Sequence, residues 1–206
     1  MEAMKGCVYL TELSDTPSWV RGAHVKPANE LVACTNGLLH VGTRELFNLT
    51  PAYFNRVSVP FKYDPDAPEP TRWLEFLHQL WPEDDESIAA VQDWFGYVIS
   101  GRTDLQKILL MIGPIRSGKG TIARLLEALL GGRGNVAGST MASLATNFGL
   151  EPLVGKPLCV ISDARMSSQN APQALERLLS ISGEDLMTID RKYKPKWTGA
   201  LPTRFS

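Results

Sequence analysis

The feature that most constrains the fold is a glycine-rich loop between an apolar run and a helical pattern. The apolar run "KILLMI" covers residues 107–112, the loop "GPIRSGKG" covers 113–120, and "TIARLLEALLG" (121–131) repeats apolar residues at helical spacing. A continuous apolar run is typical of a strand buried on both faces. A buried strand, a G-x-x-x-x-G-K loop and a helix together indicate phosphate binding within an α/β fold that has a parallel sheet.

The chemistry of the loop favours a nucleotide. Gly113 and Gly118 let the backbone turn so that its N–H groups point inward, and the following helix adds the positive end of its dipole. Lys119 reaches the β- and γ-phosphates. The residues predicted to bind the cofactor ATP are Gly113, Pro114, Ser117, Gly118, Lys119, Gly120 and Thr121. The alternative is a glycine-rich turn with a surface lysine.

Magnesium is the open point of this loop, because the hydroxyl that usually holds Mg²⁺ follows the lysine directly and Gly120 stands there. Either Thr121, one residue later, supplies the hydroxyl, or the ion keeps an extra water. Asp163, at the end of the apolar run 157–163, is predicted as a metal ligand and, with Lys119, as a catalytic residue, since ligands approach this end of strands in open α/β sheets. The alternative is that Asp163 only caps the segment that follows.

The rest of the chain divides into three parts. Residues 1–44 are expected to be irregular apart from a β-hairpin that turns at Asn36-Gly37. Residues 45–101 are expected to form a small, mainly helical domain, with one helix capped by Thr71 and a second that ends near Gly101. Residues 102–206 are expected to form a three-layer P-loop ATPase core, with a helix over 171–183, a hairpin over 186–202 and a strand that begins at "LPTRFS".

Charge is unevenly distributed, although the net charge is only −1. Residues 64–93 hold nine acids and one base, whereas residues 186–206 hold five bases (Arg191, Lys192, Lys194, Lys196, Arg204) and one acid. Arg191, Lys192, Tyr193 and Lys194 at the tip of the predicted hairpin suit DNA, because ammonium groups contact phosphates and a tyrosine stacks on bases. The alternative is a solvated hairpin tip.

Cysteine spacing and hydropathy indicate the compartment. The three cysteines show no C-x-x-C spacing, which favours neither a zinc site nor a disulfide framework. The sequence holds no apolar run long enough for a membrane span and no charged-then-apolar leader. We therefore expect a cytosolic protein without a membrane partner.

The ordered set of motifs resembles the phage and plasmid primase-helicases whose C-terminal part is a superfamily 3 helicase of the AAA+ class. The resemblance spans roughly residues 30–206 and rests on "YDPDAPEPTRWLEFL", "DWFGYVISG", "QKILLMIGPIRSGKGT", "FGLEPLVGKPLCVISDA", "LLSISGEDLMTIDRKYKPKW" and "LPTRF". It implies a helical domain that helps subunits assemble into a ring, usually a hexamer. It also implies ATP-driven unwinding of duplex DNA, with the hairpin around Tyr193 contacting DNA in the channel of the ring.

Two departures from the family pattern bear on hydrolysis. Many members carry two adjacent acids where this chain has Ser162-Asp163, which leaves the water-activating carboxylate open. In similar proteins the strand beginning at "LPTRF" continues to a polar sensor residue, and an arginine finger worth about 10³ to 10⁵ in rate follows. Neither lies within these residues, so the chain is expected to be a fragment of a larger primase-helicase.

Two other functions compete with the helicase interpretation. The sequence G-K-G-T also occurs in the phosphate loops of nucleoside monophosphate kinases, although there the loop normally opens the chain. A nucleotide-binding module without helicase activity would be expected if the sensor residue and the arginine finger are missing. Phosphoryl transfer to a monophosphate would favour the kinase, and DNA-stimulated phosphate release would favour the helicase.

Overall fold

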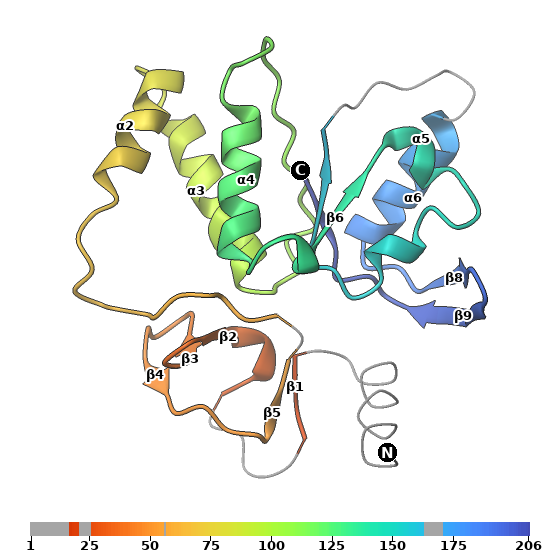
Figure 1. Ribbon diagram of the computed structural model, residues 1–206, viewed down its shortest axis with the longest axis horizontal. Helices are drawn as coiled ribbons and strands as arrows, with labels where there is room; N and C mark the ends of the chain where they lie inside the picture. The colour runs from red at the N-terminus through yellow and green to blue at the C-terminus, as the bar shows by residue number, and fades with distance from the viewer. Residues whose placement is uncertain (1–16, 21–25, 56, 163–170) are drawn as a thin grey trace.

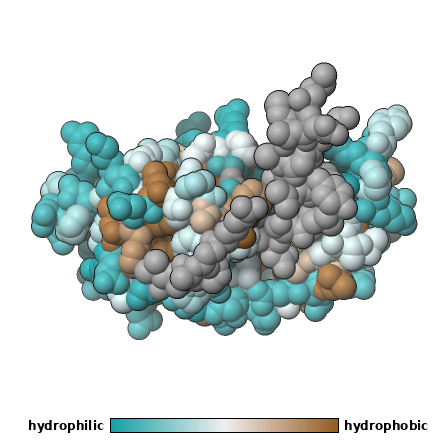
Figure 2. Space-filling view, turned by 90° about the horizontal axis from the view of Figure 1, so that it is seen from below, coloured by the Kyte–Doolittle hydropathy of each residue, from teal (hydrophilic) through white to brown (hydrophobic). Residues whose placement is uncertain are grey.

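The computed structural model describes residues 17–20, 26–55, 57–162 and 171–206, and it places a small β unit at one end of an α/β unit (Figure 1). In the β unit, β1 (Ser18–Trp19) pairs antiparallel with β5 (Tyr53–Phe54). A three-stranded antiparallel sheet has the order β2 (Leu31–Cys34), β3 (Gly37–His40) and β4 (Leu46–Phe47), and a short 3₁₀ helix, η1 (Ala28–Glu30), precedes β2. Seen from the side of the β unit, the surface is mainly polar, with apolar areas confined to a few places (Figure 2).

The predicted hairpin is present, but its turn lies one residue earlier than expected. Cys34 pairs with Gly37, which leaves Thr35 and Asn36 as the turn residues. The Asn36 side chain is held by the backbone of Tyr63, with which it makes two hydrogen bonds of 2.9 Å. Gly37 is needed for close packing instead, because a Cβ there would lie 2.6 Å from the Phe47 carbonyl oxygen of β4.

Two helices follow, and they confirm the helical patterns read from the sequence. They are α2 (Thr71–Leu80) and α3 (Asp85–Ile99). Thr71 is the first helical residue and provides no side-chain cap, whereas Asp84 caps α3 by accepting a 2.9 Å hydrogen bond from the Ser87 amide. Residues 45–70, expected to belong to a helical domain, hold β4 and β5 and no helix among the described residues. The proline-rich stretch before Thr71 explains why α2 begins there and not earlier.

The α/β unit is built on a small parallel sheet with the order β10 (Arg204–Phe205), β7 (Leu158–Ile161) and β6 (Val136–Ser139). Helices cover both faces of this sheet (Figure 1). Leu158 packs into a core with α3 and α4 (Lys119–Leu129), whereas its neighbour Cys159 packs into a second core with α5 (Met141–Leu144) and α6 (Ala171–Ser182). The mixed α/β architecture with a parallel sheet is thus confirmed.

The strand expected over residues 107–112 does not form. A single backbone hydrogen bond, from the Leu109 amide to the Phe205 carbonyl oxygen (3.0 Å), joins this segment to the edge of the sheet. Leu109 and Met111 pack against the core, but Leu110 and Ile112 are 69% and 90% exposed. The segment therefore buries one face only, and among the described residues no strand pairs with its outer edge.

The remaining elements are short. Two 3₁₀ helices, η2 (Arg133–Asn135) and η3 (Glu151–Leu153), precede β6 and β7. The expected basic hairpin is present as β8 (Met187–Arg191) and β9 (Lys194–Gly199), which pair antiparallel. Among the described residues, none of the helices has the length and apolar character needed to cross a membrane.

Candidate nucleotide-binding site

The predicted phosphate loop leads directly into α4, and its shape depends on Gly118. This residue has a left-handed φ of +82°, which side chains other than glycine rarely adopt. A Cβ at this position would lie 2.8 Å from Leu80 Cδ1 and 3.1 Å from Phe76 Cζ. The end of α2 thus lies against the loop and leaves no space for a side chain at residue 118.

Lys119 folds back over the loop. Its Nζ donates to the carbonyl oxygens of Gly113 and Pro114 at 2.8 Å each and to Ser117 Oγ at 3.0 Å. These hydrogen bonds hold the ammonium group above the loop. A bound phosphate would replace these oxygens as the hydrogen-bond partner of the ammonium group. The structure thus brings four of the predicted residues together around one cationic group.

The backbone beside Lys119 offers free donors. The amides of Gly118, Lys119 and Gly120 make no hydrogen bond within the described part of the chain, while the Thr121 amide bonds to the Gly118 carbonyl oxygen at 2.8 Å. The first N–H groups of a helix have no partner inside the helix, and its macrodipole adds positive potential there. The α4 N-terminus also carries no acidic residue in its first turn, so the arrangement favours an anion.

Two cavities adjoin the loop, and Lys119 lines both. One, of about 430 Å³, lies between the loop and the helices α2 and α3, where Trp81 and Ser87 form part of its wall. The other, of about 540 Å³, lies between α4 and α6 and is also lined by Gly120 and Ser162. Either volume is large enough for a small organic ligand beside the loop.

The described residues do not supply a complete magnesium site. Thr121 Oγ1 accepts a 3.2 Å hydrogen bond from Arg124 Nη2, and Gly120 has no side chain to offer. The described residues contain no cluster of three His, Cys, Asp or Glu side chains. Asp163, the predicted metal ligand and catalytic acid, lies outside the described residues. The described hydroxyls therefore do not fit direct coordination of Mg²⁺ on their own.

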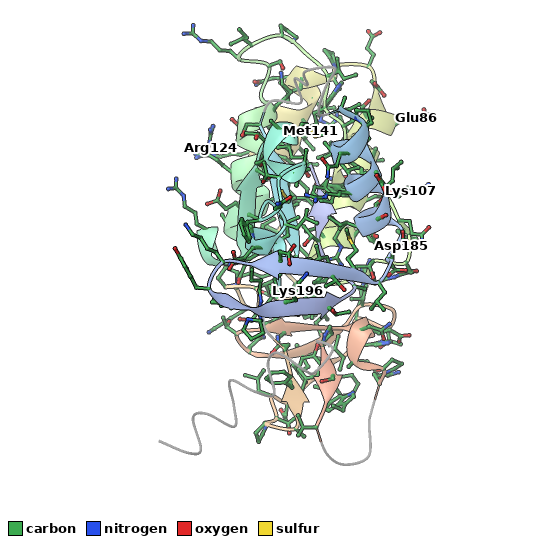
Figure 3. The ribbon with its side chains drawn as sticks, turned by 90° about the vertical axis from the view of Figure 1, so that its right-hand side faces the viewer. Glu86, Lys107, Arg124, Met141, Asp185 and Lys196 are labelled. Carbon is green, nitrogen blue, oxygen red and sulfur yellow. The ribbon has the colours of Figure 1, made fainter. Side chains whose placement is uncertain are left out.

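The basic hairpin tip stands apart from the phosphate loop, at the opposite end of the α/β unit (Figure 1). Tyr193 is 93% exposed, and Lys192 Nζ lies 5.2 Å from the centre of its ring. The Lys192 amide donates to Glu151 Oε2 at 3.0 Å, which ties the tip to η3. Lys196 pairs with Asp190 at 3.0 Å on the face that Figure 3 shows. The structure thus separates the two predicted sites.

Arg204, counted among the five bases of this region, is not available to a polyanion. Its side chain is buried, and Nη1 donates to the Pro202 carbonyl oxygen at 2.8 Å. The guanidinium lies 5.3 Å from the centre of the Tyr97 ring, and burial lowers its pKa to about 10. Arg204 therefore joins β10 to α3 and belongs to the core.

Comparisons with known families match two parts of the chain. Residues 25–82 match a model described as D5 N terminal like, and residues 111–206 match a family of unknown function, DUF5906. These two domains are typical of phage and plasmid primase-helicases, which confirms the resemblance inferred from the sequence motifs. No curated protein sequence matches the chain.

Two solved structures of the C-terminal region of NrS-1 share the fold. An apo structure of residues 305–718 has a TM-score of 0.59 at 17% identity, and the A form apo structure has a TM-score of 0.56 at 18% identity. Each match covers 99% of this chain and 47% of the other. The chain thus spans about half the length of the structures it matches, and at such identity the likeness shows the fold alone.

Proposed function

We propose that this chain binds ATP at the loop 113–120 and is the nucleotide-binding part of an AAA+-like, superfamily 3 DNA helicase. One observation carries the proposal: Lys119 and the free amides of Gly118, Lys119 and Gly120 converge at the start of α4, where no acid offsets the positive potential. Three parallel strands covered by helices on both faces support the P-loop class of this core.

ATP hydrolysis and DNA unwinding are proposed for a longer protein of which this chain would form a part. The domain pair is typical of primase-helicases, and in such proteins a ring, usually a hexamer, couples ATP hydrolysis to movement along DNA. In the proposed chemistry, Lys119 and the loop amides hold the triphosphate and stabilise charge that develops on the β–γ bridge. Magnesium, when bound, would neutralise phosphate charge, and Asp163 remains the proposed acid for that metal.

The binding experiment compares Lys119→Ala with wild type by isothermal titration with ATP. A hydrogen bond to a charged group contributes about 1.5–3 kcal/mol, so the affinity should fall by about 10- to 150-fold. Lys107→Ala is the matched control, because Lys107 is an exposed lysine just ahead of the loop and makes none of its contacts. Equal ATP affinity in wild type and Lys119→Ala would refute ATP binding at this loop.

We further propose that the hairpin tip contacts the DNA backbone. Lys192 and Lys194 flank the exposed Tyr193, which suits phosphate contacts on both sides of one stacked base. Replacing both lysines by alanine should weaken binding of single-stranded DNA and reduce the salt slope of binding by about 0.7 for each phosphate that is no longer neutralised. The control is Lys196→Ala, since Lys196 is already paired with Asp190. An unchanged salt slope would exclude the tip as a DNA-binding element.

A further inference from the structure

Arg124, a residue outside the phosphate-loop motif, reaches back to the position where that motif departs from its usual form. It lies one helical turn after Gly120 on α4. Its Nη1 is 3.3 Å from the position that a Cβ of residue 120 would occupy, and its Nη2 donates to Thr121 Oγ1 at 3.2 Å. The guanidinium group therefore lies beside the space into which the usual serine or threonine side chain would project.

The positive charge of Arg124 is uncompensated within the described part of the chain, where it makes no ion pair. Glu127, the carboxylate one turn further along α4, is paired with Arg133 at 3.4 Å instead. The Arg124 side chain is exposed and lies at the margin of the molecule (Figure 3). It can thus rotate onto an incoming ligand at the cost of one long hydrogen bond to Thr121.

Two cations, Lys119 and Arg124, therefore gather at a helix N-terminus. The helix macrodipole makes this an unfavourable place for a positive charge and a favourable one for an anion. The first turn of α4 carries no acid that would offset these two charges, so the arrangement favours an anion. A triphosphate supplies that charge, and the planar guanidinium fork matches two phosphate oxygens at once.

The position of the Arg124 guanidinium is related to the absence of a side chain at Gly120. A side chain at residue 120 would require the Arg124 guanidinium to shift by a small amount, because its Cβ would lie 3.3 Å from Nη1. Glycine at this position thus makes room for a cation where the usual loop has a hydroxyl for the metal.

We propose that Arg124 is a phosphate-binding residue that binds the β- and γ-phosphate oxygens of ATP and takes over charge neutralisation that Mg²⁺ provides in other loops. This inference rests on the proposed function of the loop. ATP affinity then depends only weakly on Mg²⁺ in the wild type. Removing the guanidinium makes binding depend on the metal.

The test measures ATP affinity by isothermal titration in Mg²⁺ and in EDTA. Wild type should lose less than about threefold in EDTA, and Arg124→Ala should lose at least about tenfold, as expected for a charged hydrogen bond. Arg124→Lys keeps the charge but not the fork, so it should recover only part of the EDTA affinity. Arg72→Ala, which removes an exposed arginine of α2 that makes no ion pair within the described part of the chain, should behave as wild type, and thermal melts should show all variants folded.

The outcomes separate this inference from the proposed function. Loss of ATP binding in Lys119→Ala, with equal affinities of wild type and Arg124→Ala in both buffers, would overturn the role of Arg124 alone. A wild type whose affinity collapses in EDTA would also overturn it. Absence of ATP binding by wild type would overturn both the phosphate-loop function and the role of Arg124.

Discussion

Replacement of Gly118 by alanine tests how α2 shapes the phosphate loop. The glycine has a φ of +82°, and a left-handed conformation costs a residue with a side chain about 1–2 kcal/mol. The new Cβ would also lie 2.8 Å from Leu80 Cδ1 and 3.1 Å from Phe76 Cζ. Overpacking costs about 1–3 kcal/mol, with the lower end expected because the ends of both side chains can shift. The sum is about 2–3 kcal/mol of unfolding free energy.

The assay is urea unfolding followed by circular dichroism, with a thermal melt beside it. A loss of about 2–3 kcal/mol corresponds to a decrease in Tm of roughly 4–12 °C for a chain of this size. Gly101→Ala is the matched control, because Gly101 has a similar φ of +76° but open space where its Cβ would lie. The Gly101→Ala variant should lose only the part of the unfolding free energy that comes from the left-handed backbone, about 1–2 kcal/mol.

The difference between the two variants isolates the contact with α2. A Gly118→Ala variant that loses no more stability than Gly101→Ala would refute the packing of Leu80 and Phe76 on the loop. A variant as stable as wild type would refute the left-handed conformation itself. ATP affinity should fall together with stability, because the same substitution moves the amides that face the phosphates.

Three further comparisons test the packing of buried positions. Leu77→Ala removes a fully buried side chain and should cost about 2–5 kcal/mol by urea unfolding, whereas Leu175→Ala, 43% exposed, should stay within about 0.5 kcal/mol. Gly37→Ala should cost about 1–3 kcal/mol, because its Cβ would lie 2.6 Å from a backbone oxygen of β4, whereas Gly134→Ala, with open space, should be near neutral. Burial raises the pKa of the Cys159 thiol from 9 to about 12, so this group contributes stability below pH 9 that is lost as the pH rises towards 12. Wild type should lose about 1.4 kcal/mol per pH unit more than Cys159→Ala in that window, and parallel pH profiles would contradict the burial of the thiol.

The helices were predictable from the sequence because their signals are local. The apolar spacing of 71–81, the acids before α3 and Gly131 after α4 each act within a turn or two of the helix they define. Residues 107–112 show the opposite case, since an apolar run does not reveal whether a neighbouring strand covers its edge. β6 was missed because "VAGS" is short, contains glycine and becomes a strand only by pairing with β7.

The residues of the candidate site also fall into those that the sequence predicts and those that it does not. Gly113, Gly118 and Lys119 were predictable because their spacing is itself the requirement for a phosphate loop. Arg124 was not, because its relation to Gly120 depends on one turn of helix and on the rotamer of a long side chain. A search for cations at i+4 from an unusual glycine in the loop would have found it. The burial of Arg204 depends on contacts with Tyr97, more than a hundred residues away in sequence.

The most direct measurement of the central claim is the amide spectrum of the ¹⁵N-labelled chain during titration with ATP. The account predicts that the amides of Gly118, Lys119 and Gly120 show the largest shifts, since these are the free donors at the start of α4. The amide chemical shifts of Lys192 and Tyr193 at the hairpin tip should not change. Shifts absent from the loop, or centred on another part of the molecule, would contradict nucleotide binding at this site.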